Sequence, residues 1–270
     1  MKVRDKLWLF CSRAHDDDVW LGKSFENRFT RWSRITPAEG AAMLDVPNVI
    51  MVGSDGVPAP YSAEAYGYME SFCRMKNVVW SIVGSGGFRA GNEEKFVCDL
   101  SHKYPNVTGV FADDFLGDGM VTSMSDEEKE EMIREIRNSL SSAARPLSMW
   151  LTLYARDLDT CDTTLYGMFD CLSMWTWDYP DLDHLQENFE KMESKFPNQK
   201  KYLGVYILDY PTGEPIPNKY MELQCEYGLS LLKEKRIEGI IFLTNCVMGV
   251  GLPSEYWLRE WIDKVKEIEV

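Results

Sequence analysis

The stretch Val107-Thr-Gly-Val-Phe-Ala-Asp-Asp114 decides how the rest of the chain is interpreted. Residues 107–112 are largely apolar and include β-branched and aromatic side chains, which predicts a buried strand. Two adjacent carboxylates, Asp113 and Asp114, follow this strand directly. In one interpretation one Asp caps a turn and the other is solvated. In the other, the strand tip faces a pocket, and the acids supply a proton donor, a base or a nucleophile.

Seven further apolar stretches predict strands, and a predicted helix follows each of the eight. The expected strands cover residues 7–12, 48–53, 78–83, 107–112, 146–153, 171–175, 202–208 and 239–243. The expected helices cover residues 37–44, 62–76, 92–103, 125–142, 163–169, 181–196, 218–235 and 254–270. Two helix starts are signalled clearly: Thr36-Pro37 is an N-cap followed by a proline at the first helical position, and Ser125-Asp-Glu-Glu128 is a capping box.

This alternation predicts the fold class. Strict strand–helix alternation implies a parallel sheet, and eight such units in about 250 residues are typical of a (β/α)8 TIM barrel. The competing fold is a doubly wound sheet, which usually has fewer strands and a glycine-rich turn after the first one. Here the first turn is Arg13-Ala-His-Asp-Asp-Asp18. We therefore expect residues 1–270 to form a single (β/α)8 barrel domain of the α/β class.

Composition limits the function classes. The chain has 270 residues and a net charge of -14, from 29 Lys and Arg against 43 Asp and Glu, with no basic run. An acidic chain of this kind is a poor partner for nucleic acid or an anionic membrane, so neither is expected. The seven cysteines are scattered without a CxxC motif, which argues against a zinc ribbon and a disulfide framework. The apolar run at the N-terminus is too short for a signal peptide, so we expect a cytoplasmic protein, unless a leader has been removed.

The strand ends differ in chemistry. Carboxylates follow six of the eight predicted strands at their C-terminal ends, with aromatic rings among them, whereas the N-terminal ends have the composition of ordinary turns. In barrels of this kind the active site lies at the C-terminal face. We therefore expect a small-molecule or oligosaccharide substrate there. The candidate substrate-binding residues are Arg13, His15, Asp55, Tyr154, Arg156, Trp175, Trp177, Tyr210 and Asn245.

Paired carboxylates with aromatic platforms are what glycoside hydrolysis needs. One acid protonates the leaving oxygen, and the other attacks the anomeric carbon or activates water. Adjacent residues of a strand point to opposite faces, so Asp113 and Asp114 are not expected to be the two partners of one pair. The partner is expected on another strand, and the candidates are Asp178 and Asp209.

The segment Gly109-Val-Phe-Ala-Asp-Asp-Phe115 resembles the fourth-strand motif of (β/α)8 glycoside hydrolases, in which an apolar run closes on catalytic acids. In barrel glycosidases of the α-galactosidase type, the nucleophile is an Asp after strand four and the acid is an Asp after strand six. The resemblance therefore implies Asp113 or Asp114 for the first role and Asp178 for the second. The Asn-Glu pair of the larger glycosidase clan is absent, and Phe115 stands where the chitinase-like DxxDxDxE motif has its Glu.

Other chemistries remain as alternatives. One is a lyase or isomerase that uses Asp side chains and His15, with an all-oxygen Mg²⁺ site near the acids that follow His15. Another is a sugar-binding barrel without catalysis. The glycines of 84–87 and 249–251 are typical of phosphate-binding loops, although they more often make turns. The preferred interpretation is a glycoside hydrolase-like enzyme that needs no cofactor and no metal.

Overall fold

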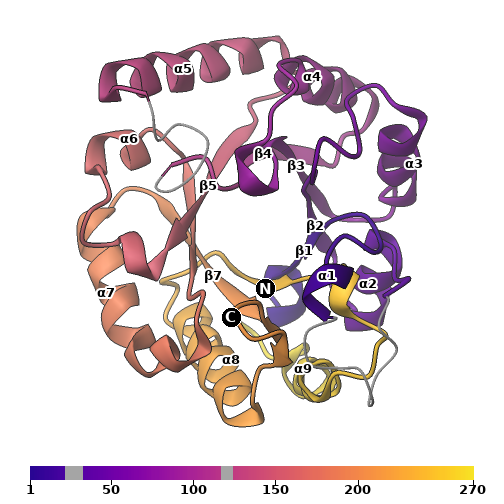
Figure 1. Ribbon diagram of the computed structural model, residues 1–270, viewed down its shortest axis with the longest axis vertical. Helices are drawn as coiled ribbons and strands as arrows, with labels where there is room; N and C mark the ends of the chain where they lie inside the picture. The colour runs from indigo at the N-terminus through magenta and orange to yellow at the C-terminus, as the bar shows by residue number, and fades with distance from the viewer. Residues whose placement is uncertain (22–32, 117–123) are drawn as a thin grey trace.

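The computed structural model describes residues 1–21, 33–116 and 124–270. Within these ranges eight parallel strands close into a barrel in the order β1-β10-β7-β6-β5-β4-β3-β2, and helices surround it (Figure 1). The expected (β/α)8 barrel is confirmed. The barrel strands are β1 (Leu7–Cys11), β2 (Asn48–Met51), β3 (Asn77–Val83), β4 (Val107–Ala112), β5 (Ser148–Tyr154), β6 (Cys171–Trp175), β7 (Lys200–Tyr206) and β10 (Gly239–Leu243).

Two helices start at the capping signals that the sequence predicts. Ser125 and Glu128 form the expected capping box of α5, and Thr36 caps α2 in the same way through Glu39. The α-helices are α1 (Asp18–Leu21), α2 (Pro37–Leu44), α3 (Ala63–Ser71), α4 (Glu93–Lys103), α5 (Asp126–Ser139), α6 (Thr163–Gly167), α7 (Leu185–Lys195), α8 (Asn218–Lys233) and α9 (Pro253–Val265). None of the described helices is long and apolar enough to cross a membrane.

Several predicted boundaries differ from the observed ones, and three of these differences follow from a contact that is distant in sequence or from an added element. Helix α3 stops at Ser71 because Asn106 Nδ2 donates to the carbonyl oxygens of Phe72 and Met75, at 2.9 and 3.0 Å, and holds a turn there. Strand β7 stops at Tyr206, and a small antiparallel hairpin of β8 (Leu208–Asp209) and β9 (Glu214–Pro215) follows it.

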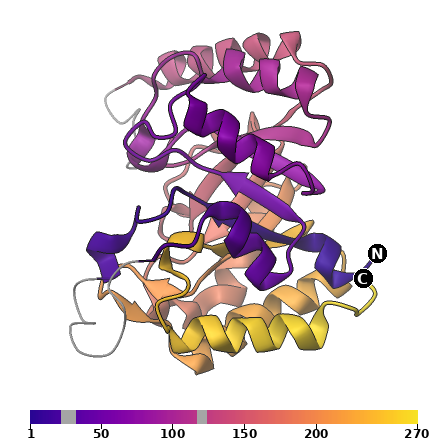
Figure 2. The ribbon, with the colours of Figure 1, turned by 90° about the vertical axis from the view of Figure 1, so that its right-hand side faces the viewer.

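The last helix is the third case. It ends at Val265, after which the chain returns to the N-terminus, where the Val270 amide donates to the Met1 carbonyl at 2.7 Å. Figure 2 shows the two termini side by side at one end of the molecule. That residues 1–270 form a single domain stays a prediction, because 22–32 and 117–123 lie outside the described ranges.

An aromatic layer fills the middle of the barrel. The Phe10 ring lies 5.8 Å from the ring of Phe111 and 5.9 Å from that of Trp175. Trp175 fits because the neighbouring strand carries Gly204 beside it: a Cβ at this position would lie 2.1 Å from Trp175 Cδ2. Side chains alternate along a strand, so residues two positions apart point to the same side. In β5, Trp150 and Thr152 both face the barrel interior, toward opposite ends of the barrel.

Candidate active site

A cavity of about 390 Å³ opens at the C-terminal ends of the barrel strands. Each of the eight strands, or the loop that follows it, contributes to its wall. The wall holds carboxylates, hydroxyls and aromatic rings, and no Lys, Arg or His lines it among the described residues. Its lining residues are Phe10, Ser12, Asp16, Asp17, Ser54, Asp55, Ser85, Gly86, Asp113, Asp114, Thr152, Tyr154, Trp175, Trp177, Tyr206, Tyr210, Leu243 and Thr244.

Asp113 is the buried acid of this cavity. It follows β4 and is 6% exposed. The Thr152 hydroxyl donates to its Oδ1 at 2.9 Å, and the Ser85 hydroxyl donates to its Oδ2 at 3.2 Å. Burial, and next the negative charge of Asp114, raise the pKa of Asp113 to about 8. The raised pKa favours the protonated form of this carboxyl group at neutral pH.

Asp114 lines the same cavity, so the expectation that the two adjacent acids point to opposite faces is wrong. Strand β4 has ended at Ala112, and Asp114 has a left-handed backbone conformation with φ of 44°. The alternation of a strand no longer applies there. The Tyr154 hydroxyl donates to Asp114 Oδ1 at 2.8 Å, and the Gly86 amide donates to Oδ2 at 3.1 Å.

A third carboxylate, Asp17, lies in the loop after β1. Its Oδ2 accepts hydrogen bonds from the Tyr210 hydroxyl at 2.6 Å and from the Cys246 thiol at 2.9 Å. Burial is the main reason why the pKa of Asp17 is raised. The sequence places this acid at the C-terminal face, in the run after His15, but Asp17 was not among the predicted site residues. Its position in the acidic loop that follows a predicted strand is the signal that indicates it.

Aromatic rings form one wall and the floor. Trp177 and Tyr210 stack with ring centroids 5.5 Å apart and an interplanar angle of 22°, and Tyr154 meets Trp177 edge-on at 6.2 Å. Trp175 is buried at the floor. The guanidinium of Arg156 lies 4.6 Å from the centre of the Tyr154 ring, beside the cavity but outside its lining. The structure thus brings four predicted aromatic residues together.

The two predicted acid partners lie elsewhere. Asp178 is exposed and does not line the cavity. Asp209 is buried, and its carboxylate accepts from the backbone amides of Thr212 at 3.2 Å and Tyr179 at 3.4 Å. It therefore holds the turn after β8, outside the cavity lining.

Besides Arg156, three more of the predicted binding residues lie outside the lining. Asn245 is fully buried and bonds the backbone of Ser12 and Ile35, which makes it a structural link between loops. Arg13 donates to Asp16 at 2.9 Å and lies at 4.0 Å from Asp55, the predicted residue at the cavity mouth.

His15 is the third of them. It is exposed and contacts Asp18 at 3.0 Å. Among residues 1–21, 33–116 and 124–270, no group of three or more His, Cys, Asp or Glu side chains is arranged to hold a metal ion. Both glycine-rich loops direct an amide at a carboxylate: Gly86 at Asp114, and Gly249 at Glu255 at 2.8 Å. In each loop, an amide that could bind a phosphate thus already donates to a carboxylate.

The fold and the cavity together define a (β/α)8 barrel with an acidic, aromatic pocket at its C-terminal face. No protein-family model and no curated protein matches the chain. Solved barrels of several hydrolases are similar to it. A GH99 endo-α-mannosidase from Bacteroides thetaiotaomicron has a TM-score of 0.61 at 10% identity, with 97% of both chains covered.

A GH18 N-acetylglucosaminidase from Paenibacillus barengoltzii has a TM-score of 0.54 at 10% identity, covering 94% of this chain and 99% of that one. A probable 2-pyrone-4,6-dicarboxylic acid hydrolase from Acinetobacter baumannii has a TM-score of 0.55 at 8% identity, covering 96% and 92%. At such identities the likeness shows the fold alone. The expected similarity to glycoside hydrolase barrels is confirmed at that level.

Proposed function

We propose that this protein is a glycoside hydrolase that uses Asp113 and Asp114 as its two catalytic carboxyl groups. One observation carries the proposal: two adjacent acids line a single aromatic-walled cavity, and the environment of each is different. A pair of carboxyl groups whose surroundings separate their protonation states is the usual basis for assigning an acid and its partner.

Asp113 is the general acid of the proposal. Its pKa of about 8 keeps it protonated at neutral pH, which is what a group that must donate to the leaving glycosidic oxygen requires. The Thr152 and Ser85 hydroxyls accept or donate by rotation, so they support the carboxyl group before and after it loses its proton.

Asp114 is the negatively charged partner. Burial is the main reason why the pKa of Asp113 is raised, and the negative charge of Asp114 raises it further. A carboxylate held by the Tyr154 hydroxyl and the Gly86 amide is fixed in orientation, so it is able to attack the anomeric carbon or to stabilise the positive charge that develops there. Asp178 and Asp209 lie outside the cavity lining, so the proposal assigns both roles to the adjacent pair.

The rest of the wall fits a carbohydrate. Trp177 is half-buried and stacked on Tyr210, and such a ring pair offers a flat apolar surface to the face of a sugar. Asp17 accepts hydrogen bonds and is suited to sugar hydroxyl groups. The similarity to glycosidase barrels gives support at the level of the fold.

The test is a panel of aryl glycosides and oligosaccharides incubated with the wild type, Asp113→Asn, Asp114→Asn and the control Asp178→Asn. We expect hydrolysis by the wild type, a loss of kcat of at least about a hundredfold in the first two variants, and near wild-type activity in the control. Proton NMR of the first product anomer then identifies retention or inversion.

Two results would overturn the proposal. Loss of activity in Asp178→Asn but not in Asp113→Asn would return the acid role to the residue after strand six. Binding of sugars by the wild type without hydrolysis of any of them would favour the alternative of a binding barrel.

A further inference from the structure

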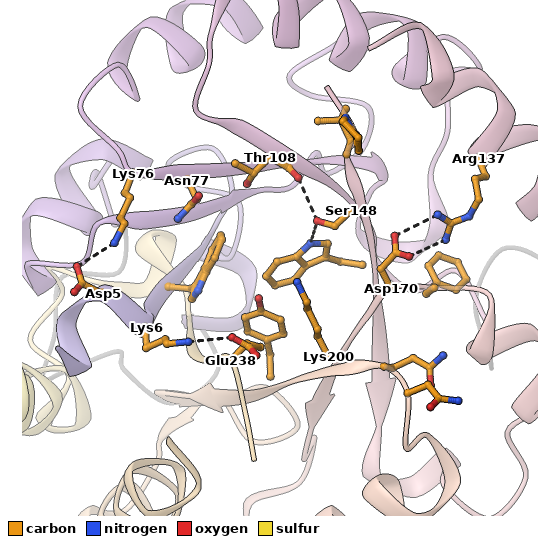
Figure 3. Close-up of a pocket in the computed structure, with 18 of the residues that line it drawn as sticks. Asp5, Lys6, Lys76, Asn77, Thr108, Arg137, Ser148, Asp170, Lys200 and Glu238 are labelled. Atoms are coloured by element: carbon orange, nitrogen blue, oxygen red, sulfur yellow. Dashed lines mark hydrogen bonds and ion pairs between the residues drawn. The ribbon is translucent and has the colours of Figure 1, made fainter. Parts of the chain in front are cut away.

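A second and larger cavity, of about 870 Å³, opens at the opposite, N-terminal end of the barrel (Figure 3). Its lining comes from the same inward-facing strand rows as the first cavity. Ser148 and Trp150 of β5 line it, whereas Thr152 and Tyr154 of that strand line the cavity at the C-terminal face. The sequence predicted only ordinary turns at this end.

An aromatic cluster forms the floor of this N-terminal cavity. The Trp150 ring lies 4.1 Å from the ring of Tyr202 and 5.0 Å from that of Trp8. Gly239 is paired with Tyr202 in the sheet and leaves room for the Trp8 ring, because a Cβ on Gly239 would lie 2.9 Å from Trp8 Nε1. Gly109 likewise leaves room for the Trp150 ring, because a Cβ on Gly109 would lie 3.0 Å from Trp150 Nε1.

Three ion pairs surround the aromatic floor, and in each of them the two opposite charges cancel. They join Lys6 to Glu238 at 3.0 Å, Lys76 to Asp5 at 3.2 Å and Arg137 to Asp170 at 3.3 Å. Lys200 is the fourth cation of the lining, and no acid pairs with it among the described residues. Figure 3 shows its side chain extending into the space between the Glu238 and Asp170 pairs. Among its side chains the cavity thus has one unneutralised positive charge, in a protein whose net charge is -14.

Two donors of the floor also lack a protein acceptor. Trp150 donates its indole N–H to Ser148 Oγ at 2.7 Å. Within the described ranges, neither the Tyr202 hydroxyl nor the Trp8 indole N–H donates to a protein group, and both side chains line the cavity. Both donors are therefore open to a ligand or to water in the cavity.

We propose that the N-terminal cavity is a second binding site, for a small anion whose carboxylate or phosphate group is held by the Lys200 ammonium, the Tyr202 hydroxyl and the Trp8 indole N–H. All three groups are donors, and one carries a positive charge, which is the chemistry that recognises an oxyanion. The carboxylates around the rim are already paired with cations, so they do not oppose the anion strongly. Burial raises the pKa of Tyr202, so its hydroxyl stays a donor at neutral pH.

The test is isothermal titration of the whole protein with sodium acetate and with sodium phosphate, each against sodium chloride at equal ionic strength. We expect saturable binding of at least one of the two oxyanions. Acetate alone would identify a carboxylate as the ligand group, and phosphate alone a phosphoryl group. In Lys200→Ala the affinity should fall by about tenfold or more, and in Tyr202→Phe, which keeps the ring, by about fivefold.

The control is Lys233→Ala at the end of α8, which removes an equal charge from an exposed position outside the lining. Its affinity should stay within about twofold of the wild type, since only screened surface charge is lost. Equal affinities of the wild type and Lys200→Ala, or no binding of either oxyanion beyond that of chloride, would overturn the proposal. No hydrolysis is measured, so the result is independent of the function proposed for the other cavity.

Discussion

The hydroxyl of Tyr154 donates a 2.8 Å hydrogen bond to Oδ1 of Asp114. The donor is the last residue of β5, and the acceptor is the second residue after β4, so two neighbouring strands together fix the orientation of one carboxylate. Thr152, two residues earlier on the same side of β5, holds Asp113 in the same way. One side of β5 therefore contacts both acids, and the loop after β3 supplies the second donor to each of them.

Replacing Tyr154 with Phe should lower kcat by about tenfold, with a smaller change in KM. The ring and its contact with Trp177 remain, but Asp114 loses a hydrogen bond worth about 1.5–3 kcal/mol to a charged group, and part of this is replaced by water. Steady-state kinetics on the best substrate of the aryl glycoside panel would measure it. The matched control is Tyr256→Phe, because Tyr256 is 55% exposed and lies outside the cavity lining. Equal losses in both variants would contradict the role given to Tyr154.

Asp113 should make the protein less stable as the pH rises from about 4 to about 8. Its folded-state pKa of about 8 lies above the ordinary value of 3.8, so between these values the folded state holds a proton that the unfolded state has released. Each such proton lowers the free energy of unfolding by up to about 1.4 kcal/mol per pH unit. Urea unfolding at pH 5, 6 and 7 should show a flatter pH dependence in Asp113→Asn, which has no proton to lose. Parallel curves for the two proteins would refute this.

Replacing Gly204 with Ala should destabilise the protein by about 2 kcal/mol or more. The added Cβ would lie 2.1 Å from Trp175 Cδ2, in a packed layer that has no room for it. Gly67 is the matched control: it lies in α3 and a Cβ there meets nothing within 4 Å, so Gly67→Ala should stabilise by about 0.5–1 kcal/mol. Thermal unfolding of the two variants should therefore shift Tm in opposite directions. Shifts of the same sign would contradict the packing argument.

Replacing Asn245 with Ala should cost stability rather than substrate binding. The variant leaves the backbone groups of Ser12 and the Ile35 carbonyl without their partner, at a cost of about 2–4 kcal/mol in total. KM measured well below the melting temperature should be unchanged. Asn138→Ala on the exposed face of α5 is the control and should alter neither quantity. A raised KM in Asn245→Ala would instead support the substrate-binding role predicted from the sequence.

The barrel was predictable because its signals are local. Apolar runs with β-branched residues mark the strands, and the capping residues Thr36 and Ser125 mark helix starts within three positions of themselves. The bounds of β4, β6 and β10 agree with the prediction at both ends. Local signals fail where a distant group intervenes, as with Asn106 at the end of α3.

The acid pair was predictable in part. Position at a strand end indicated Asp113 and Asp114, but the turn of Asp114 into the cavity depends on a positive φ that nothing in the local sequence requires. Asp17 contacts Cys246 across 229 positions, and Asn245 contacts Ser12 across 233 positions, so whether such residues face a cavity or hold loops together depends on closure of the barrel. Their chemistry was visible in the sequence, whereas their surroundings were not.

The two cavities at opposite ends of one barrel have linings of different charge. Five carboxyl groups and no described cation line the one at the C-terminal face, whereas four cations and three acids line the other. A dissolved anion therefore meets repulsion at one mouth and attraction at the other. Added salt screens both fields. Raising the ionic strength should thus ease the entry of an anion at one end while hindering it at the other, so that a single change of buffer moves the two association rates in opposite directions.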